Sequence, residues 1–235
     1  MEFHIQNDVG LRIYQDIDRT SPAQMEQLRG APASNVGDVM RRLYCMDASI
    51  RPFGVKQLLG PAFTVKVPLG DNLFIHRALD LAQPGDVLVV DGGGCMERAL
   101  MGEIMFTYAQ QRGLSGVVVN GCIRDCDSLT HLKIPVYAKG VTPQGPYKHG
   151  PGEINVPVSC GGMAILPGDV LVGDADSICV VRKNDLPKIL EEVSEKRRAE
   201  EIQLKNYASS EIDFSSHSNA YSTKVDQLRV TYYKG

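Results

Sequence analysis

Short, uninterrupted apolar runs alternate with helix-like segments through the middle of this chain. Residues 86–90 and 117–119 are mainly aliphatic, which predicts strands that are buried on both faces. Residues 72–82 place their apolar side chains mostly on one side, and residues 105–112 stop at Gly113, so both segments predict helices. A buried strand, a helix and another buried strand in succession are typical of the α/β class.

The flanking segments predict further elements of both kinds. Ser21 and Pro22 form an N-cap and first helical position, with Gly30 as the terminator, so a first helix is expected there. Further helices are expected at 35–44 and from 185 to about 205, and further strands at 63–67, 134–137, 154–158, 164–166, 170–172 and 178–181. Residues 45–60 lack periodicity and contain Pro52 and Gly54, which predicts a loop.

One sequence element occurs twice. PGDVLVVDGGG at 84–94 is echoed by PGDVLVGDADS at 167–177. Pro-Gly-Asp predicts a tight turn followed by an apolar strand. The two copies suggest a pseudo-repeated element within one sheet system. Coincident turn chemistry explains them equally well. The glycines at 92–94 do not form a dinucleotide-binding fingerprint, because the third glycine is missing and no helix opens on them, so a loop is predicted.

Composition excludes several classes of protein. The 235 residues suit a single catalytic domain over 1–205, followed by a polar tail, 206–235, that is either mobile or ordered against a neighbouring subunit. A net charge of −3 argues against a partner that is a nucleic acid. No apolar run approaches ~18 residues, so no membrane span is expected. The N-terminus lacks a signal-peptide pattern, and reduced cysteines in a cytoplasmic protein are expected.

The candidate metal-binding and substrate-binding residues follow the predicted strands. Arg124 offers a planar fork for a carboxylate, and Asp125 offers hard oxygen to Mg²⁺ or Mn²⁺. A plain salt bridge, or a helix N-cap by Asp125, would explain this pair as well. Gly102, Ile104 and Met105 lie where a helix should start, so free N–H groups there could bind a carboxylate or an enolate oxygen, unless Gly102 simply belongs to a surface helix.

Spacing adds context to these residues. Glu103 precedes Arg124 by twenty intervening residues, and PGDVLVVDGGG, GVVVNGCIRD and PGDVLVGDADSICVV surround the pattern. In these features the chain resembles the RraA-like family, which includes the 4-hydroxy-4-methyl-2-oxoglutarate/4-carboxy-4-hydroxy-2-oxoadipate aldolases and shares the pattern of an acid, twenty residues and Arg-Asp. The resemblance covers about residues 20–205. It implies an α/β fold of the swivelling β/β/α type, with central barrel-like sheets and outer helices.

The resemblance also implies roles for individual residues. Asp125 would hold the divalent metal, Mg²⁺ or Mn²⁺, and Arg124 would bind the oxo-acid end of the substrate and stabilise enolate charge. Glu103 would order water beside the metal, although the aldolases usually carry Asp there. Many family members have an acid three places after the metal-binding aspartate, where this chain has Ser128. These two departures concern the exact activity more than the fold.

A second group of residues would complete the site. The resemblance implies that Asn72, His76 and Lys148 meet the distal carboxylate or hydroxyl of the substrate, but a half-buried histidine and a surface lysine are ordinary alternatives. It also implies self-association to a trimer or hexamer with sites between subunits. Glu201, with Glu200 second, is the best match for a glutamate that enters the site from a neighbouring subunit.

The expected function is therefore a metal-dependent aldolase. It would cleave a 4-hydroxy-2-oxo di- or tricarboxylic acid, as met in aromatic-compound catabolism, to pyruvate and a second oxo acid, and would decarboxylate oxaloacetate. A Schiff-base aldolase is the rival enzyme, with candidate lysines Lys66, Lys139 and Lys148. Some RraA-like proteins inhibit an RNA-degrading endonuclease without catalysis, and this is the rival from another class. A methyltransferase lacks support, because no glycine-rich methyl-donor loop follows an early strand.

Overall fold

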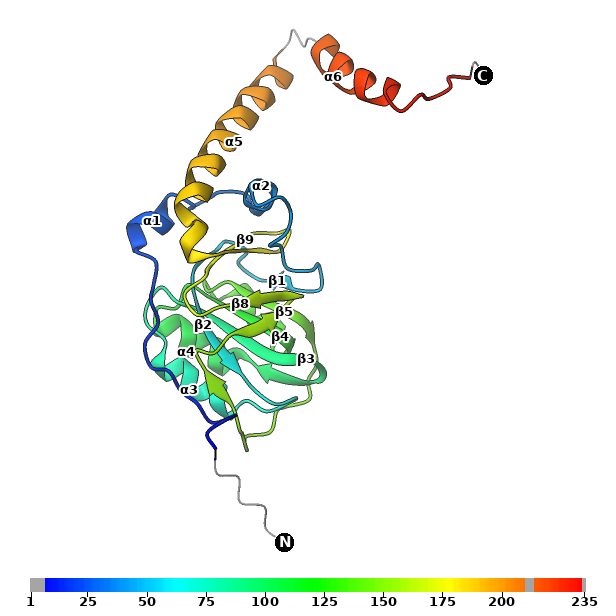
Figure 1. The fold of residues 1–235 in the computed structure, drawn as a ribbon. Coiled ribbons are helices and arrows are strands. Elements are labelled where there is room, and N and C mark those ends of the chain that lie inside the picture. Colours follow the sequence, from blue (N-terminus) through cyan, green and yellow to red (C-terminus); the bar gives the residue numbers. More distant parts are fainter. Residues whose placement is uncertain (1–6, 210–213, 234–235) are drawn as a thin grey trace. The chain divides into compact units, whose positions relative to one another are not determined.

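The structure is a computed structural model that describes residues 7–209 and 214–233. Contacts divide the chain into two compact units, Met1–Val193 and Ser194–Gly235. Every strand assigned in the described residues belongs to the first unit, which is the α/β part of the chain (Figure 1). Among those residues, no helix combines the length and the apolar character needed to cross a bilayer.

One large sheet organises the first unit. It has eight strands in the order β1–β5–β4–β3–β2–β9–β10, with β6 paired to β2. The pairs β2–β3, β3–β4 and β4–β5 are parallel, and the other pairs are antiparallel. The strands are β1 (Arg51–Phe53), β2 (Leu58–Lys66), β3 (Val87–Met101), β4 (Gly116–Ile123), β5 (Val136–Val141), β6 (Glu153–Ile154), β9 (Val170–Gly173) and β10 (Ile178–Val181), with a separate hairpin of β7 (Val158–Cys160) and β8 (Met163–Ile165).

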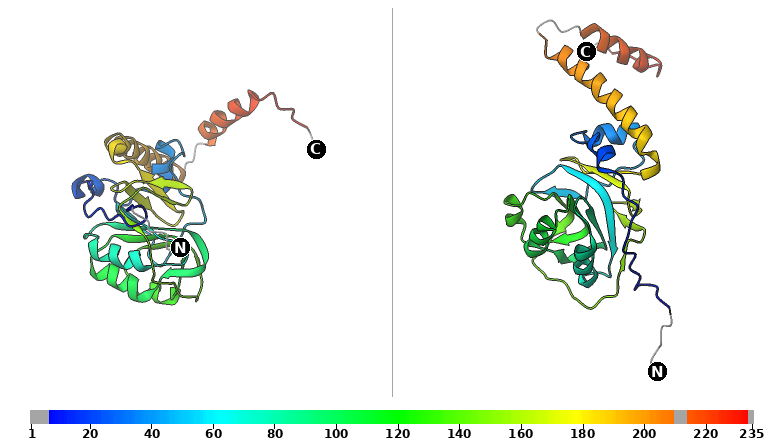
Figure 2. Two further views of the ribbon diagram at one scale, coloured as in Figure 1. Left: turned by 60° about the horizontal axis from the view of Figure 1, so that its bottom comes forward. Right: turned by 90° about the vertical axis from the view of Figure 1, so that its left-hand side faces the viewer.

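Helices α3 and α4 connect the parallel strands. They lie on the same face of the sheet, as Figures 1 and 2 show. The helices and 3₁₀ turns are α1 (Pro22–Glu26), α2 (Ala33–Val39), α3 (Leu73–Leu81), α4 (Glu103–Gln111), η1 (Cys126–Thr130), η2 (Lys183–Asp185), α5 (Leu186–Tyr207) and α6 (Phe214–Asp226). The Ser21 hydroxyl accepts a hydrogen bond from the Gln24 N–H, so the predicted cap of the first helix is confirmed.

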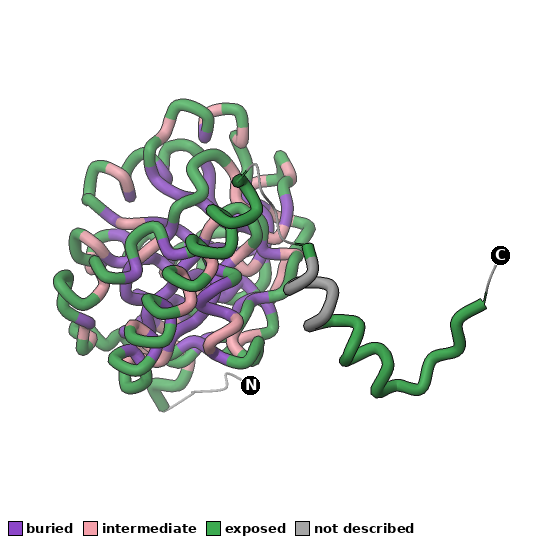
Figure 3. Tube along the Cα trace, turned by 90° about the horizontal axis from the view of Figure 1, so that it is seen from above, coloured by how far each residue is buried: buried purple, intermediate pink, exposed green. Residues whose placement is uncertain are grey.

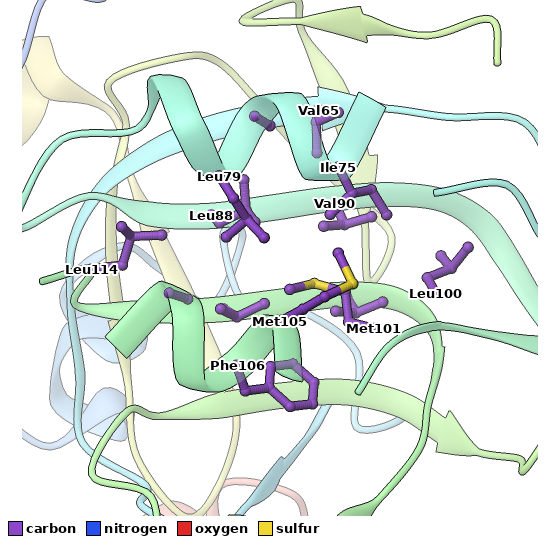
Figure 4. Packing of buried hydrophobic residues seen from close by; sticks show 14 of the residues in the cluster. Val65, Ile75, Leu79, Leu88, Val90, Leu100, Met101, Met105, Phe106 and Leu114 are labelled. Atoms are coloured by element: carbon purple, nitrogen blue, oxygen red, sulfur yellow. The ribbon is translucent and has the colours of Figure 1, made fainter. Parts of the chain in front are cut away.

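Strand β3 explains why the apolar runs are continuous. Leu88 and Val90 pack beneath α3 and α4 with Ile75 and Phe106 (Figure 4), whereas Val87 and Val89 belong to a second cluster on the other face. Because both faces of the sheet are covered, consecutive residues of the strand are apolar, whichever face their side chains point to. Most residues of the central strands β2, β3 and β4 are buried. Figure 3 shows buried segments in the interior of the first unit with exposed segments around them. The predicted buried strands in this region are confirmed.

Two predicted loops are wrong. Residues 45–60 contain β1 and the start of β2, since pairing with β5 and β9 supplies their backbone hydrogen bonds without any periodic pattern. Residues 91–94 lie inside β3, where the pairing jumps from Asp91–Asn120 to Cys95–Gly121. Gly93 and Gly94 have φ of 63° and 71°, so the glycines create a bulge within the strand instead of ending it.

The duplicated Pro-Gly-Asp element begins two strands of the same sheet. Strands β3 and β9 flank β2 on opposite sides. In each turn the aspartate accepts the N–H three residues earlier, from Gln83 to Asp86 and from Leu166 to Asp169, at 2.8 Å in both cases. An arginine also pairs with each aspartate. The echo therefore marks the same turn-to-strand junction at two places in one sheet, as predicted.

Candidate functional site

A small pocket lies beyond the carboxyl ends of the four parallel strands. The segment after each of these strands contributes residues to it, which is the usual place for ligands in an open α/β sheet. The pocket encloses about 130 Å³. Its lining residues are Asn72 and His76 after β2, Gly102, Ile104 and Met105 after the core of β3, Arg124 and Asp125 after β4, Pro146 and Lys148 after β5, together with Ala99, Leu100 and Met101 of β3.

The Arg124–Asp125 pair and Gly102 form one side of the pocket. The Arg124 Nε lies 3.5 Å from Asp125 Oδ2, and both side chains are more than 40% exposed, at 43% and 44%. A Cβ on residue 102 would lie 2.5 Å from Asp125 Oδ2 and 2.9 Å from Arg124 Cγ. A side chain at residue 102 would therefore displace the pair, so glycine keeps the carboxylate and the guanidinium side by side and open to a ligand.

The backbone conformation of Asp125 and two hydrogen bonds from neighbouring residues fix its position. Its φ and ψ are 59° and 40°, in the left-handed region, where aspartate and asparagine are tolerated better than most residues. The Ser128 hydroxyl donates to the Asp125 carbonyl at 2.7 Å, and the Glu103 N–H donates to Asp125 Oδ2 at 3.2 Å. Ser128 therefore stabilises the turn that contains Asp125.

Glu103 lies at the first turn of α4, at the edge of this pocket. Its backbone N–H contacts Asp125, but its side chain is exposed, and Glu103 is not among the residues that line the pocket. Gly102 and Ile104, on either side of it, do line the pocket. The Glu103 backbone is thus held beside the Arg124–Asp125 pair, and its side chain is exposed to solvent.

Asn72 and His76 form the opposite wall on α3. The Asn72 Nδ2 donates to the Leu100 carbonyl at 2.9 Å, whereas its Oδ1 is buried and has no hydrogen-bond partner among the described residues. A buried acceptor without a partner costs about 1–3 kcal/mol. Burial, and then the positive charge of Lys148, lower the pKa of His76, so its neutral form is favoured near neutral pH.

A clamp that the sequence did not reveal holds the loop that carries Lys148. Arg98 of β3 donates to the Gly145 carbonyl at 2.8 Å and to the Tyr147 hydroxyl at 2.7 Å, and its guanidinium carbon lies 4.0 Å from the centroid of the Tyr147 ring. Buried Asp71 accepts the His149 N–H at 2.6 Å. Only pairing between segments far apart in sequence brings these groups together, so no local motif marks them.

Replacing Arg98 with alanine is expected to raise the KM for the oxo-acid substrate that the sequence predicts by roughly tenfold while kcat changes little. The loop would lose three anchoring contacts, and Lys148 would no longer be held at the distal end of the pocket. Steady-state kinetics with oxaloacetate or a 4-hydroxy-2-oxo acid measures the effect. Arg77→Ala is the matched control, since Arg77 is an exposed arginine of α3 that pairs with Asp80. An unchanged KM in Arg98→Ala would show that the clamp does not position the loop.

The remaining predicted residues lie elsewhere. Lys66 and Lys139 are outside the pocket lining, and of the three candidate Schiff-base lysines only Lys148 contributes to it. Glu200 and Glu201 belong to α5 in the second compact unit. A role for Glu201 at a neighbouring subunit's site remains a prediction.

The pocket suits a divalent cation of the magnesium type. Asp125 presents a carboxylate with hard oxygen atoms, of which Oδ2 accepts a single amide hydrogen bond, and Gly102 leaves room beside it. Mg²⁺ binds through as few as one or two carboxylates and retains several waters. Among the described residues, no group of three His, Cys, Asp or Glu side chains is assembled for a metal. A divalent cation would therefore be held by a single carboxylate, that of Asp125, with Arg124 beside it.

Comparison with known proteins identifies the family. The model of the RraA-like family, described as Aldolase/RraA, matches residues 33–180. The chain belongs to the RraA-like family. A relative from Halalkalibacterium halodurans, named "Putative 4-hydroxy-4-methyl-2-oxoglutarate aldolase", is 39% identical over 176 residues, which cover 74% of this chain and 84% of that protein. RraA-like relatives of this name support an aldolase, or lyase, activity.

Solved structures confirm the RraA-like fold. RraAS2 from Streptomyces coelicolor, described as an unusual member of the RNase ES inhibitor RraA protein family, is 26% identical with a TM-score of 0.72, covering 80% of this chain and 98% of that one. A Geobacillus kaustophilus protein described as an S-adenosylmethionine:2-dimethylmenaquinone methyltransferase is 34% identical with a TM-score of 0.60, covering 64% and 94%. The predicted α/β swivelling fold is therefore confirmed.

Proposed function

We propose that the chain is a divalent-metal-dependent aldolase. Its substrate would be a 4-hydroxy-2-oxo di- or tricarboxylic acid, and its products pyruvate and a second oxo acid. One observation carries the proposal: Arg124 and Asp125 lie side by side in a pocket that Asn72, His76 and Lys148 also line. The pocket thus combines a carboxylate that could hold a metal with the nitrogen-bearing side chains of Arg124, His76 and Lys148, and this combination suits a small acid with several carboxylates.

Cleavage of the C3–C4 bond leaves its electron pair on the pyruvate fragment as an enolate. Arg124 binds the carboxylate and 2-oxo oxygens of that fragment, and its fixed positive charge stabilises the enolate oxygen as it forms. Ile104 lies in the first turn of α4, and the N-terminal end of this helix adds partial positive charge to the same side. A divalent cation at Asp125 would supply Lewis-acid stabilisation of the same oxygen.

The hydroxyl at C4 must lose its proton when the bond breaks. Glu103, whose backbone N–H contacts Asp125, would orient a water molecule that accepts this proton. At the other wall, Asn72, His76 and Lys148 would bind the distal carboxylate or hydroxyl of the substrate. Loss of CO₂ from oxaloacetate yields the same enolate, so oxaloacetate decarboxylation is proposed as a side activity.

Pyruvate release in the presence of Mg²⁺ tests this function. We expect turnover with at least one member of a panel of 4-hydroxy-2-oxo diacids and triacids, with oxaloacetate as a further substrate. EDTA should abolish the activity and added Mg²⁺ or Mn²⁺ should restore it, whereas borohydride together with substrate should leave the enzyme active. Full activity in thoroughly metal-stripped protein, or inactivation by borohydride with modification of Lys148, would favour the Schiff-base mechanism instead.

A non-catalytic regulator of an RNA-degrading endonuclease is the second candidate. The similarity to RraAS2, described as a member of an RNase inhibitor family, supports it. A pure regulator has no use for a metal-binding carboxylate at Asp125. Absence of pyruvate release across the whole panel, together with inhibition of such a nuclease, would decide for the regulator.

Self-association to a trimer or hexamer is also proposed, with Glu201, or Glu200, of one subunit completing the site of another. Ile104 supports the proposal, because this aliphatic side chain at the edge of the pocket is 82% exposed and a neighbouring subunit would cover it. The mass in solution by light scattering tests the assembly. A monomer that is fully active would contradict it.

A further inference from the structure

Two cysteines that are far apart in the sequence lie side by side in the first compact unit. Cys45 follows α2, Cys179 lies in β10, and the two form an isolated antiparallel bridge. The Met46 N–H donates to the Ile178 carbonyl at 2.8 Å, and the Val180 N–H donates to the Tyr44 carbonyl at 2.9 Å. Backbone hydrogen bonds therefore flank the cysteines on both sides, so the cysteines occupy a non-hydrogen-bonded pair position.

This kind of position suits a disulfide. In a non-hydrogen-bonded antiparallel pair the Cα atoms lie about 4.5 Å apart and the side chains leave on the same face, within the range of about 4.4–6.8 Å found for disulfides. The two Sγ atoms are 3.5 Å apart. A side-chain shift of roughly 1.5 Å would bring them to the bond length of about 2.05 Å. No rearrangement of the backbone is needed.

The two thiols differ in their surroundings. Cys45 is exposed, whereas Cys179 is 2% exposed and its Sγ donates to the Ala33 carbonyl at 3.1 Å. A Cβ on residue 37 would lie 2.8 Å from the Cys45 Sγ and 3.4 Å from the Cys179 Sγ, so Gly37 of α2 packs directly over both sulfur atoms. Because Cys45 is an exposed residue, an oxidant in solution approaches the pair from the Cys45 side, and Cys179 is the buried thiol beside it.

We propose that Cys45 and Cys179 are a modification site, at which a peroxide converts the two thiols to an intramolecular disulfide. The Cys45 thiolate attacks one peroxide oxygen, the O–O bond breaks, and the oxygen that leaves departs as water, giving a sulfenic acid on Cys45. The Cys179 sulfur then attacks the Cys45 sulfur, the S–O bond breaks, and hydroxide takes up a proton to leave as a second water. Two thiols are oxidised to one disulfide and hydrogen peroxide is reduced to two waters.

The second step is expected to be the slower one. Burial raises the pKa of the Cys179 thiol, so little thiolate is present to attack. The sulfenic acid on Cys45 should then persist long enough to be trapped by dimedone. The resulting disulfide would tie the segment after α2 to β10 across 134 positions of the chain, and closing so long a loop should stabilise the fold.

Peptide mapping of the full chain tests the proposal. The protein is treated with hydrogen peroxide, unfolded, alkylated with iodoacetamide and digested without reductant. We expect a linked peptide that contains Cys45 and Cys179 and disappears on treatment with dithiothreitol, and a midpoint of thermal unfolding raised by about 5 °C or more. With dimedone present during oxidation, the adduct should form on Cys45.

Matched variants separate this pair from the other cysteines. Cys45→Ser and Cys179→Ser should each abolish the linked peptide, and Cys179→Ser should increase the dimedone adduct on Cys45. Cys95→Ser, the control, should leave the linked peptide unchanged. A Cys45 that oxidises to sulfinic acid while Cys179 stays free for alkylation, a disulfide between two chains through Cys45, or no oxidation of either residue would each overturn the proposal. The readout is independent of the proposed catalytic activity.

Discussion

Asp125→Asn is expected to lower metal-dependent pyruvate release by roughly 10³-fold, the scale of removing one preorganised electrostatic group from an active site. Asparagine keeps an oxygen that can accept the Glu103 N–H and tolerates the left-handed conformation at φ 59°, so the turn should persist. The variant removes the negative charge, which weakens binding of a divalent cation. Alanine is a poorer choice, because its Cβ is strained at this φ.

The measurement is the rate of pyruvate release as a function of Mg²⁺ concentration. The residual activity of Asp125→Asn should require much more Mg²⁺ for half-saturation, while its midpoint of thermal unfolding stays within a few degrees of the original. Asp127→Asn is the matched control, since Asp127 is an exposed aspartate of the adjoining turn η1 and does not line the pocket. Normal turnover by Asp125→Asn at low Mg²⁺ would refute the metal assignment.

Arg124→Lys should reduce kcat/KM by about 10²-fold, although the positive charge is retained. Lysine offers a point charge in place of a planar fork, so it cannot make two parallel hydrogen bonds to a carboxylate. The guanidinium lines the pocket, with Nε 3.5 Å from Asp125 Oδ2, and a Cβ on residue 145 would lie 3.2 Å from Nη1. Because the enolate charge develops during cleavage, most of the loss should appear in kcat.

Chemical rescue makes the Arg124 prediction specific. Arg124→Ala should be less active than Arg124→Lys, and added guanidinium ion should restore part of its activity in a saturable way. The same concentration of guanidinium should not rescue Asp125→Asn. If Arg124→Lys were as active as the original protein, a fork at this position would be unnecessary and its role in binding the oxo-acid end would be wrong.

Much of the site could be predicted from sequence, because each candidate follows a strand of a parallel sheet. The carboxyl ends of such strands meet at one edge, so the segments that contain Asn72, Gly102, Arg124 and Lys148 converge once the strands pair. The two wrong loop predictions have a different cause. Strand β1 forms because β5 pairs with it, and β3 continues through its glycines because a bulge keeps it paired to β4.

The sequence by itself determined the α/β class, the buried parallel strands and the family pattern of Glu103, Arg124 and Asp125, since apolar periodicity and short motifs are local properties. Only the tertiary structure decided which groups meet. It placed Arg98 against the loop of Lys148, left the Asn72 oxygen unpaired beside the pocket, and brought Cys45 to Cys179. These contacts join segments separated by many residues, so pairing and packing of the whole sheet, and no local pattern, bring them together.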